Sequence, residues 1–259
     1  MKKIKIVLRI LTTFIVNIYY KLKFNLIDKN KRLLIYTDSR GFLINCFLCN
    51  KTPKNSYISM LSKEFNIDYQ LCTKTHTTIL DFLNYIENKN LHQYDYIILH
   101  LGIVDFSTRP LSQFDKVYNK KNKISKKLFS NIEMKAQYYD DIYEGEKTFT
   151  LYDKEYFRKA ILPRINEISK TTKIIWIGIN RIDLYWDGNY AKKRPSNINN
   201  ILEYQKVILN YIKNNETNIT YIDIDSIESF NLKKHTVDNI HLSKDGFELF
   251  YCILKEKLK

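Results

Sequence analysis

Apolar positions divide this chain into short continuous runs and longer periodic stretches. Five short runs rich in Ile, Leu, Val and Tyr have the length and continuity of parallel strands that are buried on both faces. They cover residues 32–37, 67–72, 94–101, 173–179 and 220–224. Amphipathic stretches predict helices at residues 57–65, 77–88, 154–171, 198–214 and 243–258. This alternation predicts a single α/β domain with a five-stranded parallel sheet, covering residues 30–259.

One segment, at about residues 110–153, interrupts the alternation, and we interpret it as an insertion. It contains no clean strand pattern, and its first part is rich in lysine (Lys116, Lys120, Lys121, Lys123, Lys126 and Lys127). A loop of this length is uncommon inside a compact domain unless it serves as a lid or a binding element. A solvated insertion without a role is the alternative that the sequence leaves open.

Residues 1–29 form a separate unit with the pattern of a basic amphipathic helix. One helical face carries Ile4, Val7, Leu8, Leu11, Phe14, Ile15, Ile18 and Leu22. The other face carries Lys5, Arg9, Thr12, Thr13, Asn17 and Lys21. Such a helix can lie on an anionic membrane surface, or it can pack its apolar stripe on the domain. We expect neither a spanning helix nor a secretory signal, because the uncharged stretch 10–20 is too short to cross a bilayer and no small-residue cleavage site follows it.

Composition places the chain among globular proteins. Of its 259 residues, 44% are hydrophobic and 27% are charged, and only 6 are Gly and 4 are Pro. The formal net charge of +14 could indicate a nucleic-acid partner. The excess Lys is spread along the whole chain, however, and no recognition motif accompanies it. We therefore expect no nucleic-acid partner.

The four cysteines, Cys46, Cys49, Cys72 and Cys252, are too scattered for a disulfide framework. Cys46 and Cys49 have the spacing of a zinc pair, but no second Cys/His pair completes four ligands. Their apolar neighbours indicate that both thiols pack inside a helix. We therefore expect no metal, no cofactor and a cytoplasmic protein with reduced cysteines.

The residues that follow the predicted strands form a pattern with chemical meaning. Ser39 follows the first strand, where its hydroxyl can project over the sheet edge and its N–H lies near a helix start. Asp238 and His241 lie just before the last helix, three residues apart. A carboxylate at this spacing can orient the imidazole while the other ring nitrogen takes a proton from a serine.

With these motifs the chain resembles the SGNH/GDSL hydrolase superfamily over roughly residues 31–258. The matching blocks are Asp38-Ser39, Gly102-Ile103-Val104-Asp105 and Asp238-Asn239-Ile240-His241. The resemblance implies a flavodoxin-like, three-layer α/β/α fold. It also implies Ser39 as nucleophile, His241 as base and Asp238 as its orienting carboxylate.

Two departures from the family pattern concern the oxyanion. Val104 stands where the family has an asparagine whose amide donates to the oxyanion, and Thr75 is the match for the missing glycine of the second block. The backbone N–H of Thr75 can still donate, and Gly102 keeps the glycine of the third block. Arg109 and Arg40 are the candidate replacement donors, with a structural ion pair as the alternative for each.

The resemblance implies a serine ester hydrolase, and we expect its substrate to be a small-molecule or glycan ester, such as an acetyl ester of a bacterial surface polysaccharide or glycan precursor. An O-acyltransferase that uses the same residues is one alternative. A non-catalytic binding module on the same scaffold, held at the inner face of a membrane by its basic helix, is the other.

Overall fold

The five apolar runs form one parallel sheet. The computed structural model describes residues 2–44, 51–186, 188 and 194–259. The strands are β1 (Arg32–Thr37), β2 (Asn66–Leu71), β3 (Tyr96–His100), β7 (Lys173–Ile177) and β8 (Ile219–Ile222), and their order across the sheet is β2-β1-β3-β7-β8. Every pair of neighbours is parallel. The predicted sheet is therefore confirmed.

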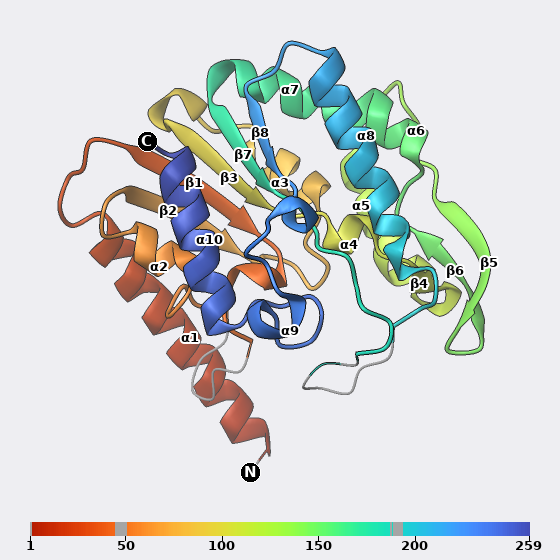
Figure 1. Ribbon diagram of the computed structural model, residues 1–259, viewed down its shortest axis with the longest axis horizontal. Helices are drawn as coiled ribbons and strands as arrows, with labels where there is room; N and C mark the ends of the chain where they lie inside the picture. Colours follow the sequence, from red (N-terminus) through yellow and green to blue (C-terminus); the bar gives the residue numbers. More distant parts are fainter. Residues whose placement is uncertain (1, 45–50, 187, 189–193) are drawn as a thin grey trace.

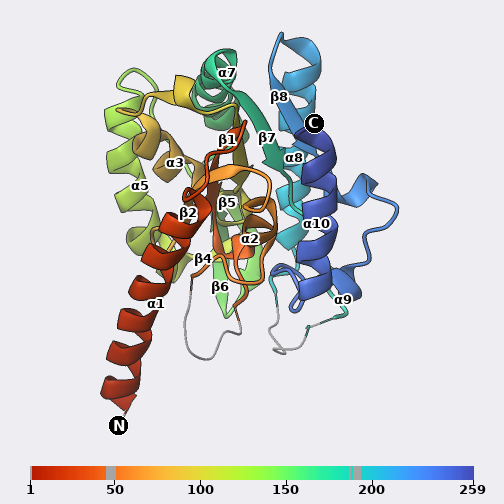
Figure 2. The ribbon, with the colours of Figure 1, turned by 90° about the vertical axis from the view of Figure 1, so that its left-hand side faces the viewer.

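Helices cover both faces of the sheet, because side chains alternate between the faces along each strand. Leu33 and Ile35 of β1 pack with the helices of one layer, whereas Leu34 and Tyr36 pack with those of the other. The first layer contains α1 (Lys2–Phe24), α2 (Tyr57–Leu61) and α10 (Lys244–Lys257). The second contains α3 (Ile79–Ile86), α7 (Leu162–Thr171) and α8 (Ile201–Asn214). Figures 1 and 2 show this three-layer α/β/α arrangement, which confirms the expected fold class.

Helix boundaries differ from the predicted ranges where local hydrogen bonds decide them. The stretch 154–171 is one helical run made of α6 (Lys154–Tyr156), a π turn (Phe157–Ile161) and α7. Helix α3 starts two residues later than predicted, because Thr78 caps it and forms a capping box with Asp81.

The expectation of a loop between about residues 110 and 153 is wrong. The segment holds α5 (Phe114–Leu128) and the hairpin strands β5 (Gln137–Tyr143) and β6 (Glu146–Thr150). With β4 (Arg109–Pro110) these strands form a second, antiparallel sheet in the order β4-β6-β5. Two further short helices, α4 (Ile103–Phe106) and α9 (Leu232–His235), also lie outside the predicted elements.

Helix α1 does not pack its apolar stripe on the domain, so that alternative is wrong. Leu11, Phe14 and Ile18 are 54%, 64% and 44% exposed, whereas Phe24 at the helix end is 2% exposed. Within the described residues, no helix has the length and apolar character needed to cross a membrane. The predicted helical placement of Cys46 and Cys49 lies outside the described residues.

Candidate active site

The candidate nucleophile Ser39 lies in a 3-10 turn, η1 (Ser39–Gly41), that follows β1. Asp38 caps this turn, because its carboxylate accepts a hydrogen bond from the backbone N–H of Arg40 at 2.9 Å. The backbone N–H of Asp38 donates to the carbonyl of His100 at 3.0 Å, which fastens the turn to the end of β3. Ser39 is thus held at the carboxyl edge of the sheet, where open α/β folds bind their ligands.

Ser39, His241 and Asp238 form a hydrogen-bonded row. The Nε2 atom of His241 lies 2.8 Å from the Ser39 hydroxyl, and its Nδ1 atom lies 2.8 Å from Oδ2 of Asp238. Burial opposes ionisation of Asp238, but hydrogen bonds from the ring and backbone of His241 and from the backbone of Ile240 outweigh it. The pKa of the Asp238 carboxyl consequently lies below its ordinary value. The structure therefore brings together the three residues that the sequence proposes, with a carboxylate facing the imidazole.

Three residues that the sequence analysis missed hold the Asp238–His241 turn in place. Asn239 has a left-handed φ of 73°, and its side-chain oxygen accepts from the backbone N–H of Asp183 at 2.9 Å. The side chain of Asn180 donates to the carbonyl of Asn239 at 2.9 Å. Arg194 lies 3.5 Å from the Asp238 carboxylate. The signal available in the sequence was Asn239 itself, because asparagine tolerates a left-handed conformation better than most residues.

Arg40 does not fit its expected place as an oxyanion donor. It is 1% exposed, and its guanidinium pairs with the Asp38 carboxylate, with Nη2 at 2.9 Å from Oδ2. Its Nη1 donates to the carbonyl of Gly178 at 2.7 Å. Arg40 is also absent from the residues that line the cavity beside Ser39. The expectation of a donor at Arg40 is therefore wrong, and the structural ion pair describes this residue.

Ser39 and His241 open onto a cavity of about 490 Å³. Thr75 lines it from the loop after β2, and Val104 lines it from helix α4, which follows β3. Gly102 is not part of the lining; its φ of 122° turns the chain from β3 into α4, where a Cβ atom would meet the Phe106 ring at 2.9 Å. The polar residues that complete the lining are His76, Ser107, Thr108, Arg109, Gln113, Lys116, Tyr143, Glu144 and Arg194.

The backbone N–H groups of two lining residues are candidate oxyanion donors. Among the described residues, no acceptor pairs with the backbone N–H groups of Ser39 and Thr75.

Burial and the nearby cations Arg109, Lys121, Lys116 and Lys120 lower the pKa of His76 to about 4. This histidine is therefore neutral at physiological pH, and the surrounding field is positive.

Arg109 is the cation placed closest to the substituted third block. Its Nη2 atom donates to the carbonyl of Val104 at 2.6 Å, and its Nε atom is buried with no partner among the described residues. Burial lowers the pKa of its guanidinium to about 10, which leaves it protonated at neutral pH. Arg109 lines the same cavity as Ser39, as expected for a residue at the end of the third-strand motif.

Asp105, the carboxylate of the third block, joins three segments below the cavity. Its Oδ1 atom accepts from the backbone N–H of Ile79 at 3.0 Å and from the Tyr152 hydroxyl at 2.7 Å. Its Oδ2 atom has no partner within the described part of the chain. Burial raises the pKa of this carboxyl to about 7. A proton on Oδ2 is the state that best suits such a fully buried group.

This burial makes part of the stability depend on pH. The folded pKa of Asp105 lies above its ordinary value of 3.8, so the group stabilises the fold at acidic pH and that contribution is lost as pH rises from about 4 to about 7. Asp105→Asn removes the titration. We expect the free energy of unfolding of the variant, relative to the parent, to rise over this range by up to about 4 kcal/mol.

Urea unfolding at a series of pH values measures this difference. The exposed Asp115, substituted in the same way, is the matched control. A pH-independent difference for Asp105→Asn would show that the carboxyl is ionised in the folded protein across the range.

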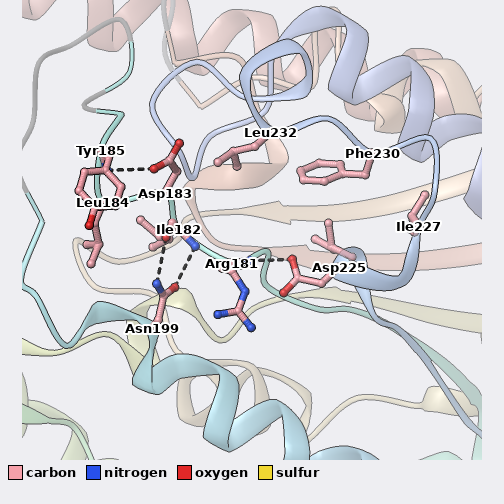
Figure 3. A pocket seen from close by; sticks show the side chains of 11 residues that line it. Arg181, Ile182, Asp183, Leu184, Tyr185, Asn199, Asp225, Ile227, Phe230 and Leu232 are labelled. Atoms are coloured by element: carbon pink, nitrogen blue, oxygen red, sulfur yellow. Dashed lines mark hydrogen bonds between the residues drawn. The ribbon is translucent and has the colours of Figure 1, made fainter.

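A second cavity, also of about 490 Å³, lies beyond the carboxyl ends of β7 and β8 (Figure 3). Its polar wall carries Arg181, Asp183 and Asp225, and its apolar wall includes Phe230 and Leu232. It shares no lining residue with the cavity beside Ser39. Its link to the candidate site is indirect, through the hydrogen bond from the backbone N–H of Asp183 to the Asn239 side chain in the Asp238–His241 turn. Within the described residues, no group of three or more His, Cys, Asp or Glu side chains is arranged to hold a metal ion.

No protein-family model matches this chain, and no curated protein matches it. Solved structures do match it. A lipase/acylhydrolase from Enterococcus faecalis is 14% identical with a TM-score of 0.51, and the match covers 88% of this chain and 95% of that one. A Streptococcus pneumonia protein, provisionally described as a platelet activating factor, is 13% identical with a TM-score of 0.51, over 97% of this chain and 94% of that one. At these identities the likeness concerns the fold alone, and it confirms the three-layer architecture that the resemblance to the SGNH/GDSL superfamily implies.

Proposed function

We propose that this chain is a serine-dependent acyl ester hydrolase of the SGNH type. The observation that carries the proposal is the row of hydrogen bonds from Ser39 through His241 to Asp238, with 2.8 Å at each of its two steps. A serine hydroxyl in contact with an imidazole, whose other nitrogen faces a carboxylate, is the arrangement that activates a serine for attack on an ester carbonyl.

The reaction then runs in two balanced halves. Ser39 Oγ attacks the carbonyl carbon while His241 Nε2 takes its proton, and Asp238 stabilises the resulting imidazolium. The tetrahedral intermediate collapses, the alkoxide leaves with the proton from His241, and an acyl-Ser39 ester remains. Water, deprotonated by His241, attacks this ester and releases the acid and free Ser39.

The oxyanion of the tetrahedral intermediate needs donors. The backbone N–H groups of Ser39 and Thr75 supply two, since no described residue accepts from either. Arg109 supplies the third in place of the side-chain amide that Val104 lacks, because its guanidinium is bonded to the Val104 carbonyl and the residue lines the same cavity. A guanidinium brings charge as well as directed hydrogen bonds.

The polar part of the cavity lining supports a polar substrate. Hydroxyl, amide and cationic side chains such as Thr108, Gln113 and Arg194 share its lining. Such groups suit the hydroxyls of a sugar better than a long hydrocarbon chain. We therefore propose an acetyl ester of a glycan, of the kind found in a bacterial surface polysaccharide or its precursor. An acceptor hydroxyl in place of water in the second half-reaction would make the protein an O-acyltransferase.

Covalent labelling tests the proposal. A fluorophosphonate should label the protein with one equivalent, and 4-nitrophenyl acetate should be hydrolysed. Ser39→Ala should abolish both results. The matched control is Ser107→Ala, because Ser107 lines the same cavity but its hydroxyl donates to the carbonyl of Ile103. Absence of labelling and turnover in the folded parent protein would contradict the proposal and favour a binding module.

A further inference from the structure

Exposed apolar side chains are concentrated on one helix. Of the eighteen large apolar side chains that are exposed among the described residues, twelve lie between Ile6 and Ile27. Six of them follow one another at helical spacing and are between 44% and 67% exposed; we call them the outward stripe, and they are Val7, Leu11, Phe14, Ile15, Ile18 and Leu22. Soluble monomers rarely expose a contiguous apolar patch of this kind unless it binds something.

The body of the protein already has its own contacts with α1, and they come from a different face. The side chain of Asn17 donates to the carbonyl of Lys51 at 3.0 Å and accepts from the Tyr69 hydroxyl at 2.9 Å. Near the end of the helix, Phe24 is buried. The outward stripe therefore has no role in holding α1 on the sheet, and intramolecular packing does not explain it.

These contacts also define the direction of the helix. Asn25 bonds to Ile67 near the start of β2, whereas Asn17 bonds to Tyr69 and to Lys51, whose ammonium reaches the carbonyl of Cys72 just past the strand. Helix α1 thus runs antiparallel to β2. With a rise of about 1.5 Å per residue, its first half extends well beyond the carboxyl edge of the sheet. Figures 1 and 2 both show this half projecting from the body.

Charge decides what can cover the outward stripe. Six basic residues occur before Asp28, and no acidic residue does; they are Lys2, Lys3, Lys5, Arg9, Lys21 and Lys23. A second copy of the same helix would bring an equal positive charge to the interface and would be repelled. An anionic lipid surface attracts this charge, and its acyl region accepts the apolar stripe.

We propose that α1 is a peripheral anchor whose outward stripe inserts into the surface of an anionic lipid bilayer. Asn17 keeps the second half of the helix on the protein, the basic side chains face the lipid head groups, and the outward stripe enters the boundary between head groups and acyl chains. Because the free half of α1 projects past the sheet edge that carries Ser39 and His241, a docked molecule keeps its cleft close to the lipid surface.

Vesicle flotation with the full chain tests this proposal. We expect the protein to float with vesicles that contain phosphatidylglycerol. With vesicles of phosphatidylcholine alone, we expect it to remain in the bottom fraction of the gradient. High salt should release part of it, because the Debye length falls to about 3 Å at about 1 M salt. The triple variant Leu11→Gln, Phe14→Gln, Ile18→Gln should lower the bound fraction at least about tenfold, since it removes a large part of the inserted apolar area.

A matched control separates insertion of the outward stripe from nonspecific adsorption of exposed apolar side chains to lipid. The variant Tyr138→Gln, Ile142→Gln, Leu209→Gln removes three exposed apolar side chains elsewhere and should bind like the parent. Both variants should unfold close to the parental temperature, because every replaced side chain is at least 38% exposed. Equal binding by the α1 variant would overturn the proposal. The proposal would also be overturned if the parent protein did not bind vesicles and sedimented as an oligomer, while the α1 variant sedimented as a monomer. The outward stripe would then be an interface between copies of this chain.

Discussion

His241→Ala is expected to lower turnover of an acetyl ester by about 10⁴- to 10⁶-fold while the protein stays folded. Without the imidazole, the proton on Ser39 has no acceptor, because Nε2 of His241 lies 2.8 Å from the hydroxyl. The stability should change little, because the backbone N–H groups of Ile240 and His241 and the guanidinium of Arg194 still face the Asp238 carboxylate when the ring is removed. Steady-state kinetics and thermal unfolding of the same preparation measure the two effects.

Asp238→Asn should cost less than loss of the base, at most about 10⁴-fold in turnover. The two residues act as a unit, so the double variant should be no slower than His241→Ala alone. Multiplicative losses would mean that Asp238 acts apart from the imidazole. If His241→Ala instead unfolds the protein at the assay temperature, so that the lost activity follows from lost structure, this histidine is structural.

Arg109→Ala carries the second large expected effect, a loss of about 100- to 1000-fold in kcat with little change in KM. The reason is that a donor aimed at the oxyanion acts on the transition state and not on the bound substrate. Lys116→Ala is the control, because Lys116 is another cation in the lining of the same cavity. It should change KM more than kcat.

Val104→Asn in the Arg109→Ala background should restore part of the lost kcat, because it returns an amide to the third block. The same substitution with Arg109 present should do much less. Should Arg109→Ala raise KM and leave kcat unchanged, the guanidinium binds substrate in its ground state. Arg109→Met, which keeps the bulk without the charge, guards against a result that reflects only a cavity in the fold.

The parallel sheet could be predicted because its strands are buried on both faces and so form continuous apolar runs. β1 was predicted with its observed limits, Arg32–Thr37. The hairpin could not be found in this way, since β5 has no buried residue and a sequence, QYYDDIY, without a regular apolar face. Helix α5 was hidden by its many lysines, although Val117 and Lys121 are buried one turn apart.

Site residues could be predicted where their residue types and their places after the predicted strands identify them. They could not be predicted where their partners come from distant parts of the chain or depend on the direction of a side chain. Ser39, Asp238 and His241 could be proposed from their places at strand ends. The pairing of Arg40 with Asp38 depends on a tight turn that directs the guanidinium into the core. The direction of this side chain cannot be predicted from the sequence. Arg194 approaches Asp238 from a segment 44 residues away, a proximity that spacing alone does not reveal.

The hairpin turn between β5 and β6 has a further consequence. Its two residues, Glu144 and Gly145, have φ of 55° and 81°, and Tyr143 and Glu144 reach the cavity beside Ser39. Turns of this kind at the tip of an exposed hairpin tolerate replacement and lengthening. The reacting atoms, by contrast, are held by the parallel sheet. In the proposed function, ligand contacts from this turn can therefore change while the row from Ser39 through His241 to Asp238 stays as it is.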